Sequence, residues 1–403
     1  MRRVITVTAA ALAAITLAPG TAFAVDWSLD PTFAEEGVLR VTGLRDSTFT
    51  DVTAHDGAGV AAGGTLGGRD ADVLVAVSSA DGVLDPTFSG DGVVSRAGLG
   101  GAARGVRLAV GTDGVITAVT AFERRVAVYQ WTPTGERNTS FGADGLKELR
   151  VPNALGYNAP RVAVDRRGRV VVAAMTGNGT ASDVLVYRLR PNGRLDANFS
   201  GDGARTINNG KVDWIDALAT DGQNRVLVGT DTYSPSSSRE PSALVHRLTD
   251  AGRDDSSFSG NGLVALRLAP KTGSLALDIK PGSGGVSVAL GRWGSHYGVA
   301  RLTDAGRLDR SYGDLGMLSV NCQCVMIAAD LRNGQAAFSG LRPDLISTVV
   351  ARLGDEGTSV VTGEFDVVQA STVDYGQAVL VQGTKTLLVG RAYSDDPFMA
   401  RLQ

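Results

Sequence analysis

Short apolar runs separated by turn residues dominate the pattern along the chain. Residues 161–164 read Arg-Val-Ala-Val, a turn follows at Arg167-Gly168, and residues 170–173 read Val-Val-Val-Ala. Apolar runs of this length, bounded by Gly, Asp and Asn, are typical of β-strands joined by tight turns. We therefore expect an all-β protein. In this part of the chain the pattern predicts four strands, at residues 160–165, 169–175, 183–190 and 203–208.

A short motif recurs six times at a nearly constant step. In each copy an Asp or Asn stands three residues before an aromatic residue, and a Gly stands four residues after it. Successive aromatic residues are 55, 53, 58, 59 and 54 positions apart. Chance does not produce six copies in phase, so the chain is a repeat protein. The copies are Asp30, Phe33 and Gly37; Asp85, Phe88 and Gly92; Asn138, Phe141 and Gly145; Asp196, Phe199 and Gly203; Asp255, Phe258 and Gly262; Asp309, Tyr312 and Gly316.

The repeat length favours a β-propeller. Four strands in about 54 residues, repeated along the chain, are typical of propeller blades, whereas solenoid repeats are usually about 20–30 residues long. Arg352-Leu353 marks a seventh copy of the strand before the motif, although the motif after it has decayed. We expect a seven-bladed propeller of four-stranded antiparallel blades.

The segments at the two ends of the chain together match one repeat, which is divided between them. Arg401 occupies the repeat position of Arg188 and Arg247, and the chain ends shortly before the turn that would follow it. The pattern near residue 27 begins at almost the same point of the repeat. We therefore expect a strand near Val38–Thr42 to complete the last blade, whose other strands come from residues 377–402.

These motifs resemble the delta-60 repeat family of bacterial β-propellers. The closest matches are Asp81-Gly82-Val83-Leu84-Asp85-Pro86-Thr87-Phe88 and Asn192-Gly193-Arg194-Leu195-Asp196-Ala197-Asn198-Phe199. The resemblance covers residues 25–403 and departs from the family pattern at Asn138 and between Gly354 and Phe365. It implies a propeller fold. The family carries no established catalytic residues, so the resemblance transfers no site to this chain.

Residues 1–24 have the features of a signal peptide. Arg2-Arg3 precede an apolar segment from Val4 to Ala18, and Ala22-Phe23-Ala24 forms a small-x-small cleavage site. A short membrane anchor is the alternative, but the apolar run is too short to span a bilayer comfortably, and no later segment is long enough. We expect cleavage after Ala24 and a secreted or extracytoplasmic, monomeric protein with one domain, residues 25–403.

Composition excludes several classes of function. The net charge is −3, so the chain has no basic footprint for nucleic acid. With 3 His and 2 Cys it cannot readily supply the ligands of a zinc site. The sequence lacks a P-loop, a G-x-S-x-G elbow and an H-E-x-x-H motif. We predict no cofactor and no catalytic motif residue.

The motif residues themselves are best explained structurally. The Asp can accept turn N–H groups, the aromatic side chain can pack between blades, and the Gly can adopt a positive φ. The alternative is calcium binding at Gly90-Asp91-Gly92 and Gly201-Asp202-Gly203. Calcium needs about six to eight oxygen ligands, and Gly260-Asn261-Gly262 shows that the copies vary too much to supply them. We expect no metal site.

Three functions remain open. They are a binding or interaction scaffold for an extracellular glycan or protein, an enzyme of the lyase, hydrolase or lactonase type at the ring centre, and a purely structural surface protein. An enzyme should present matched polar residues on several innermost strands, and those strands show scattered charges instead. The deciding question is whether Asp51, Arg107, Asp216 and Asp278 meet in one cleft.

Aromatic and arginine residues gather in the loops of one blade face. In a four-stranded blade, the loop from strand two to three and the loop to the next blade emerge on the same side. Tyr, Trp and Arg are enriched in binding hot spots, and loops often carry function. Alternatively, these aromatic residues cap the blade ends. The residues of this candidate binding face, centred on the two tryptophans, are Tyr157, Trp214, Tyr233, Trp293, Tyr297, Arg342, Tyr375, Arg391 and Tyr393.

The only cysteines, Cys322 and Cys324, stand two residues apart. In an extended strand their Cα atoms would be about 7 Å apart, near the upper limit for a disulfide. A bridge therefore requires a bent backbone, which the loop-to-strand junction at residues 321–324 allows. The sequence leaves open whether the two thiols are bridged or free.

Overall fold

The computed structural model describes an all-β protein. Every regular element in the described residues is a β-strand. The described residues are 22–24, 28–44, 46–56, 59–67, 72–97, 105–122, 124–152, 159–177, 182–210, 212–233, 242–268, 274–291, 296–321, 324–341, 348–353, 360–365, 375–391 and 396–403.

The third repeat contains the four strands that the sequence predicts. They are β11 (Arg161–Val164), β12 (Val170–Gly177), β13 (Ser182–Leu189) and β14 (Ala204–Ile207). Each strand pairs antiparallel with the next one along the chain. The predicted boundaries are confirmed to within two residues.

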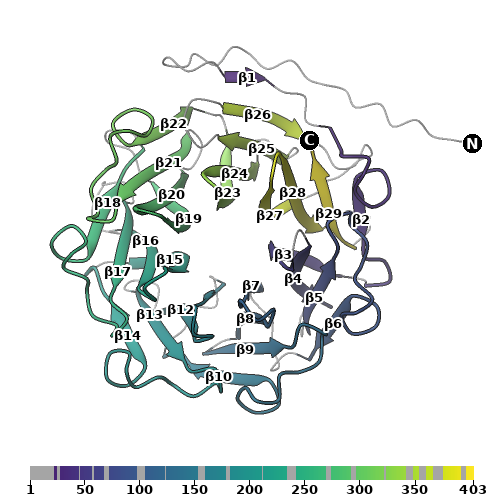
Figure 1. The fold of residues 1–403 in the computed structure, drawn as a ribbon, viewed down its shortest axis with the longest axis horizontal. Helices are drawn as coiled ribbons and strands as arrows, with labels where there is room; N and C mark the ends of the chain where they lie inside the picture. Colours follow the sequence, from purple (N-terminus) through teal and green to yellow (C-terminus); the bar gives the residue numbers. More distant parts are fainter. Residues whose placement is uncertain are drawn as a thin grey trace, which may run out of the picture.

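The same four-stranded antiparallel unit recurs along the chain, as Figure 1 shows, with the sheets arranged around a common centre. The first strand of each unit lies nearest the centre. The units are β3 (Thr48–Ala54), β4 (Val60–Leu66), β5 (Asp72–Ser78) and β6 (Val93–Arg96); β7 (Arg107–Val110), β8 (Ile116–Phe122), β9 (Arg125–Trp131) and β10 (Leu146–Arg150); β15 (Val212–Thr220), β16 (Val226–Tyr233), β17 (Ser242–Leu248) and β18 (Leu263–Leu266); β19 (Leu275–Gly282), β20 (Gly285–Gly291), β21 (His296–Thr303) and β22 (Met317–Asn321); β23 (Val325–Arg332), β24 (Gln335–Leu341), β25 (Thr348–Leu353) and β26 (Val360–Phe365).

Two further pairings extend this pattern. The unit β11–β14 is linked to β15–β18 by a parallel bridge between Ser182 and Val212, so the two units are continuous. Strand β1 (Ala22–Ala24) pairs parallel with β26.

The last unit combines strands from both ends of the chain. It consists of β27 (Tyr375–Gln382), β28 (Lys385–Arg391), β29 (Pro397–Leu402) and β2 (Val38–Arg40). Strand β2 pairs antiparallel with β29, with Leu39 opposite Met399. The backbone N–H of Asp30 also donates to the carbonyl of Arg401 at 2.8 Å. The strand expected at Val38–Thr42 therefore pairs where the sequence places it, and the arrangement of sheets is propeller-like.

The motif turns have a common geometry. In each of the six copies, the Asp or Asn side chain accepts the backbone N–H two residues later, at 2.9–3.3 Å. The motif glycines all have positive φ values, between 74° and 98°. A Cβ atom on Gly92 would stand 2.8 Å from the Cβ of Leu84, so both conformation and space require glycine there.

The motif aromatic residues are buried between neighbouring sheets. Phe88 packs in a cluster that contains Val75 of its own sheet and Ile116 and Trp131 of the next one. The other five aromatic side chains are equally enclosed. Their burial adds apolar contact between one sheet and the next, which stabilises the fold.

An arginine completes the motif in several units, and its partners were not foreseen from the sequence. Arg188 on β13 is almost fully buried. Its Nε donates to Asp196 Oδ2 at 2.9 Å, and its Nη1 donates to Asp250 Oδ1 of the next unit at 2.9 Å. Its guanidinium lies 4.8 Å from the ring centroid of Phe199. We call this arrangement the arginine clamp, since it ties one motif turn to the next.

Similar clamps occur elsewhere in the described part of the chain. Arg247 binds Asp255 at 2.7 Å and Asp304 of the following unit at 3.0 Å. Arg401 binds Asp30 at 2.6 Å, and it also donates to the backbone carbonyl of Ala80.

Candidate ligand-binding cavity

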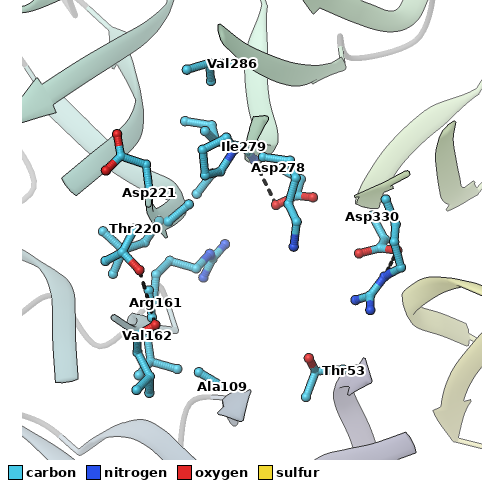
Figure 2. A pocket seen from close by; sticks show the side chains of 18 of the residues that line it. Thr53, Ala109, Arg161, Val162, Thr220, Asp221, Asp278, Ile279, Val286 and Asp330 are labelled. Carbon is cyan, nitrogen blue, oxygen red and sulfur yellow. Dashed lines mark hydrogen bonds and ion pairs between the residues drawn. The ribbon is translucent and has the colours of Figure 1, made fainter. Parts of the chain in front are cut away.

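A cavity of about 950 Å³ lies where the first strands of the units meet. Residues of β3, β7, β11, β15, β19, β23 and β27 line it, together with the turns that follow several of these strands. Figure 2 shows Arg161, Asp278 and Asp330 around this space, with the small side chains of Ala109 and Thr53 on the side away from Asp278.

Ionisable side chains converge on this cavity from six different strands. The first strands β3, β7, β11 and β15 contribute Asp51, Arg107, Arg161 and Asp216, while β19 contributes Asp278 and Lys280 and β23 contributes Asp330 and Arg332. Further charged residues line the cavity from turns between strands; they are Asp165, Arg166, Asp221, Arg225 and Asp304. The four residues named in the deciding question therefore do meet in one cleft. The expectation of scattered charges without a matched arrangement was wrong.

β-Bulges in the first strands explain why the sequence did not predict this convergence of charged residues. The pairing of β3 with β4 shifts between Phe49 and Asp51, and that of β19 with β20 shifts between Ala276 and Asp278. An extra residue in one strand reverses which side chains face inward from that point on. Strict alternation of inward and outward side chains therefore mispredicts which residues face the cavity after a bulge.

Three of the aspartates connect neighbouring first strands. Asp51 Oδ2 accepts the N–H of Leu108 at 2.7 Å, and Asp278 Oδ2 accepts the N–H of Leu331 at 2.9 Å. Asp330 Oδ2 accepts the N–H of Val381 at 2.8 Å. Backbone N–H groups at the inner edge of a sheet need partners when they are buried. These carboxylates provide them and so help to hold the units around the centre.

Burial changes the proton affinity of these carboxyl groups. Desolvation raises the pKa of Asp51. Desolvation also raises the pKa of Asp278, to about 6, and the negative charge of Asp330 acts in the same direction. Both shifts follow from the cost of placing a charge where water is scarce.

A carboxyl pair stands beside the cavity. The side chain of Asp216 is hydrogen-bonded to that of Asp231 on β16, which is 6% exposed. Desolvation and the charge of Asp216 raise the pKa of Asp231 well above its ordinary value. A hydrogen bond between two carboxyl groups requires that one of them keeps a proton. We assign this proton to Asp231.

Backbone carbonyls hold Arg107 and Arg161, two of the arginines that line the cavity. Arg161 donates from Nε to the carbonyl of Asp216 at 2.5 Å and from Nη1 to that of Ala159 at 2.7 Å. Arg107 donates from Nη1 to the carbonyl of Thr50. Within the described part of the chain, neither arginine forms an ion pair with a carboxylate. Desolvation lowers the pKa of Arg161 to about 10, and the nearby positive charge of Arg107 contributes to this shift.

The candidate binding face is only partly described. Trp214 is 38% exposed and lies two residues before Asp216 on β15. Arg391 is exposed at the end of β28. Tyr233 and Tyr375 lie at strand ends, and their side chains are outside the described set. Tyr157, Trp293, Arg342 and Tyr393 lie outside the described residues.

Tyr297 needs a correction. Its side chain is fully buried, and its ring lies 5.0 Å from that of Phe338 on the next unit. Tyr297 therefore belongs to the packing between sheets, and we exclude it from the binding face. Its position at the start of β21, directly after a loop, suggested exposure, but the strand turns this side chain inward.

The structure describes one of the two cysteines, Cys324. Cys324 is buried and disulfide-bonded. Cys322 lies outside the described residues, so its pairing with Cys324 stays a prediction.

No metal centre and no membrane helix occur in the part of the chain that the structure describes. These residues contain no cluster of three or more His, Cys, Asp or Glu side chains suited to a metal ion. They also contain no apolar helix of the length that a membrane span requires.

Comparison with known proteins adds information on the fold. No protein-family model matches the chain, and no curated protein matches its sequence. Among solved structures, the chain is similar to the polysaccharide lyase Uly1, with a TM-score of 0.50 and 8% identity over 88% of this chain and 89% of that one.

Two other similarities are lower. The β-propeller domain of the Trilobed protease from Pyrococcus furiosus has a TM-score of 0.48 and 8% identity, with 88% of this chain and 93% of that one covered. Puromycin hydrolase has a TM-score of 0.47 and 14% identity over 91% of this chain, which spans 53% of the hydrolase. At such identities the likeness concerns the fold alone.

Proposed function

We propose that the protein is an exported binding module, built as a closed seven-bladed β-propeller whose central cavity holds a polar ligand. The repeat pattern supports seven blades, and the pairing of β2 with β29 supports closure by strands from both ends. The features of residues 1–24 support export with cleavage after Ala24, and the repeats resemble the delta-60 family. Cleavage would also remove β1 and leave β26 as an outer strand.

The convergence of ionisable side chains from six first strands in one cavity carries this proposal. A volume of about 950 Å³ lies within the range of about 300–1,000 Å³ that is usual for ligand sites. Carboxylates and guanidinium groups bind ligands rich in hydroxyl or charged groups. The exposed ring of Trp214, near Asp216 on the same strand, offers a flat apolar surface. These features suit an extracellular glycan better than an apolar ligand.

A cavity-filling substitution tests where the ligand binds. Ala109 lines the cavity, so Ala109→Trp should obstruct it. Val83 is 61% exposed and does not line it, which makes Val83→Trp the matched control. A glycan array and a pull-down with residues 25–403 should identify the ligand. Binding should fall at least tenfold in Ala109→Trp and stay unchanged in the control.

The other outcomes separate the remaining alternatives. Unchanged binding in Ala109→Trp, together with weaker binding in Trp214→Ala, would place the ligand on the outer loops instead. A protein that binds no extracellular glycan or protein would be a purely structural surface protein. In that case, the carboxylates of the cavity would act only as connections between strands.

The carboxyl pair favours an enzyme as the second candidate function. Two carboxyl groups that share one proton can donate a proton at one step and accept one at another, as general acid–base catalysis requires. Asp216 lines the cavity, and Asp231 lies behind it. A hydrolase, lyase or lactonase reaction at the ring centre would use Asp216. In a screen of such substrates, Asp216→Asn should reduce turnover about 100-fold or more while binding persists. Turnover that survives this change would exclude the pair from catalysis.

A further inference from the structure

Arg107 and Arg161 stand on neighbouring first strands, at equivalent positions of β7 and β11. Arg107 is opposite Val119 of β8, and Arg161 is opposite Ala173 of β12. Both side chains line the cavity, and Figure 2 shows the guanidinium of Arg161 extending into it. The geometry therefore places two positive charges side by side on one wall of the cavity.

Backbone carbonyls hold these guanidinium groups in fixed orientations. Arg161 uses Nε and Nη1 for the carbonyls of Asp216 and Ala159. Arg107 uses Nη1 for that of Thr50. A guanidinium has five N–H donors, so each group keeps further donors for the cavity. Donors that are already oriented bind a ligand without losing side-chain freedom at that moment.

Neither of these two charges is in direct contact with a carboxylate of a described residue, although several aspartates lie nearby. Neither arginine forms an ion pair among the described residues, and the charge of Arg107 is near enough to lower the pKa of Arg161. Like charges that face each other in a partly desolvated space repel one another. An anion that contacts both groups would relieve this repulsion and satisfy the remaining donors.

The surrounding acids limit the charge of that anion. Asp51 and Asp216 are close enough to affect Arg161 electrostatically. A phosphate would bring up to two negative charges among these carboxyl groups, whereas a carboxylate brings one. A carboxylate is also planar and matches the fork of a guanidinium. Asp278 and Asp330 on the other units can accept hydrogen bonds from hydroxyl groups of the same ligand.

We propose that Arg107 and Arg161 form a subsite for the carboxylate of an acidic sugar, so that the ligand of the central cavity is a uronic-acid-containing glycan. This inference rests on the proposed binding function. It adds a chemical class of ligand and assigns the two residues that recognise it.

A matched pair of oligosaccharides tests the subsite. The probes are a uronic-acid tetrasaccharide and the neutral tetrasaccharide of the same linkage, titrated calorimetrically at low salt. The acidic probe should bind at least tenfold more tightly, and added salt should weaken its binding more than that of the neutral probe. Arg107→Gln should reduce acidic-probe binding at least tenfold. Arg194→Gln removes the same charge from an exposed turn outside the cavity and should have no effect.

Two further measurements keep the test decisive. Arg107→Lys keeps the charge without the fork, so it should restore part of the lost affinity if folding is intact. Inorganic phosphate and a peptide with a free terminal carboxylate serve as competing anions, and tighter binding of either than of the acidic sugar would contradict the proposal. A neutral probe that binds equally well, with no effect of Arg107→Gln, would overturn the subsite. If Ala109→Trp still blocked that binding, the proposed function would stand. Failure of the acidic probe to bind would also overturn the subsite.

Discussion

Two neighbouring units build the same motif turn from different chemistry. In the unit β11–β14, Arg188 and Asp196 form a buried ion pair. In the unit β7–β10, the equivalent residues are Gln130 and Asn138, and Asn138 Nδ2 donates to Gln130 Oε1 at 2.9 Å. Both units keep the turn, the positive-φ glycine and the buried aromatic residue. The fold of the repeat therefore depends on those three features, and the charged pair can be replaced by a neutral one of similar shape.

The difference lies in what each pair can reach. Arg188 extends past Asp196 to Asp250 in the next unit. Gln130 is too short for this contact, and its Nε2 donates to Thr117 on its own sheet at 3.0 Å. In the unit after β7–β10, the position that corresponds to Asp250 is occupied by Pro191. The charged version thus ties two units together, whereas the neutral version serves only its own sheet.

Removal of the acidic residue of the charged pair should cause the largest difference in stability between the two units. Asp196→Ala leaves the buried guanidinium of Arg188 without its main partner, which typically costs about 3–5 kcal/mol. Asn138→Ala removes the equivalent neutral group and should cost about 1–2 kcal/mol. Both substitutions also remove the same turn hydrogen bond. The difference between the two losses in the free energy of unfolding therefore measures the contribution of the buried charge. Urea unfolding at pH 7 measures it. Equal losses would show that the ion pair has no special weight.

A buried histidine should make the unit β15–β18 sensitive to acid. His246 stands where the two preceding units have Tyr129 and Tyr187, and desolvation lowers its pKa to about 4. Above pH 6.5 it is neutral in the folded and unfolded chains and costs nothing. Between pH 6.5 and 4 only the unfolded chain takes up the proton, so the free energy of unfolding falls, by about 3 kcal/mol in total.

The variant His246→Tyr isolates this effect. Its free energy of unfolding should fall less than that of the parent as the pH is lowered from 7 to 4, measured in urea at each pH. Parallel curves for the two proteins would show that His246 does not sense the pH. The tyrosines of the neighbouring units make this change conservative in size.

Converting one unit into the other should have the smallest effect. The double change Arg188→Gln and Asp196→Asn copies the pair found at Gln130 and Asn138. Because no buried charge is left unpaired, we expect a loss of about 1 kcal/mol, mainly from the contact with Asp250. The loss should be well below that of Asp196→Ala alone. If the double variant were as unstable as Asp196→Ala, other contacts in the unit β7–β10 would have to stabilise its neutral pair.

The sequence predicted the repeating parts of the fold better than the site. The strands of residues 161–207 and the motif turns follow from local patterns, because alternation and turn residues act over a few positions. The central cavity depends on residues more than 50 positions apart, such as Asp51 and Leu108, and on bulges that alternation does not reveal. Tyr297 was misplaced for a similar reason, since its burial depends on Phe338 of another unit.

The sequence contains a pattern from which the partners of the clamp arginines can be predicted. Arg188 and Arg247 were recognised as repeat positions, but no partner was assigned to them. Their partners could have been found by comparing copies. Arg188 and Arg247 are followed by Asp at the motif position and by Asp250 or Asp304 in the next turn, whereas Gln130 is followed by Pro191.

The pairing of β2 with β29 has a consequence for the order of events during synthesis. Leu39 and Met399 are separated by about 360 residues, so β2 leaves the ribosome long before its partner exists. In a flexible chain, bringing segments this far apart together costs about 5 kcal/mol of chain entropy. Folding of the intervening units reduces this cost before the two strands pair. A chain cut short at any point before β29 would keep β2 and the edge of β28 unpaired. Synthesis of β29 and burial of these two sheet edges are thus coupled, because neither edge has its partner before β29 is made.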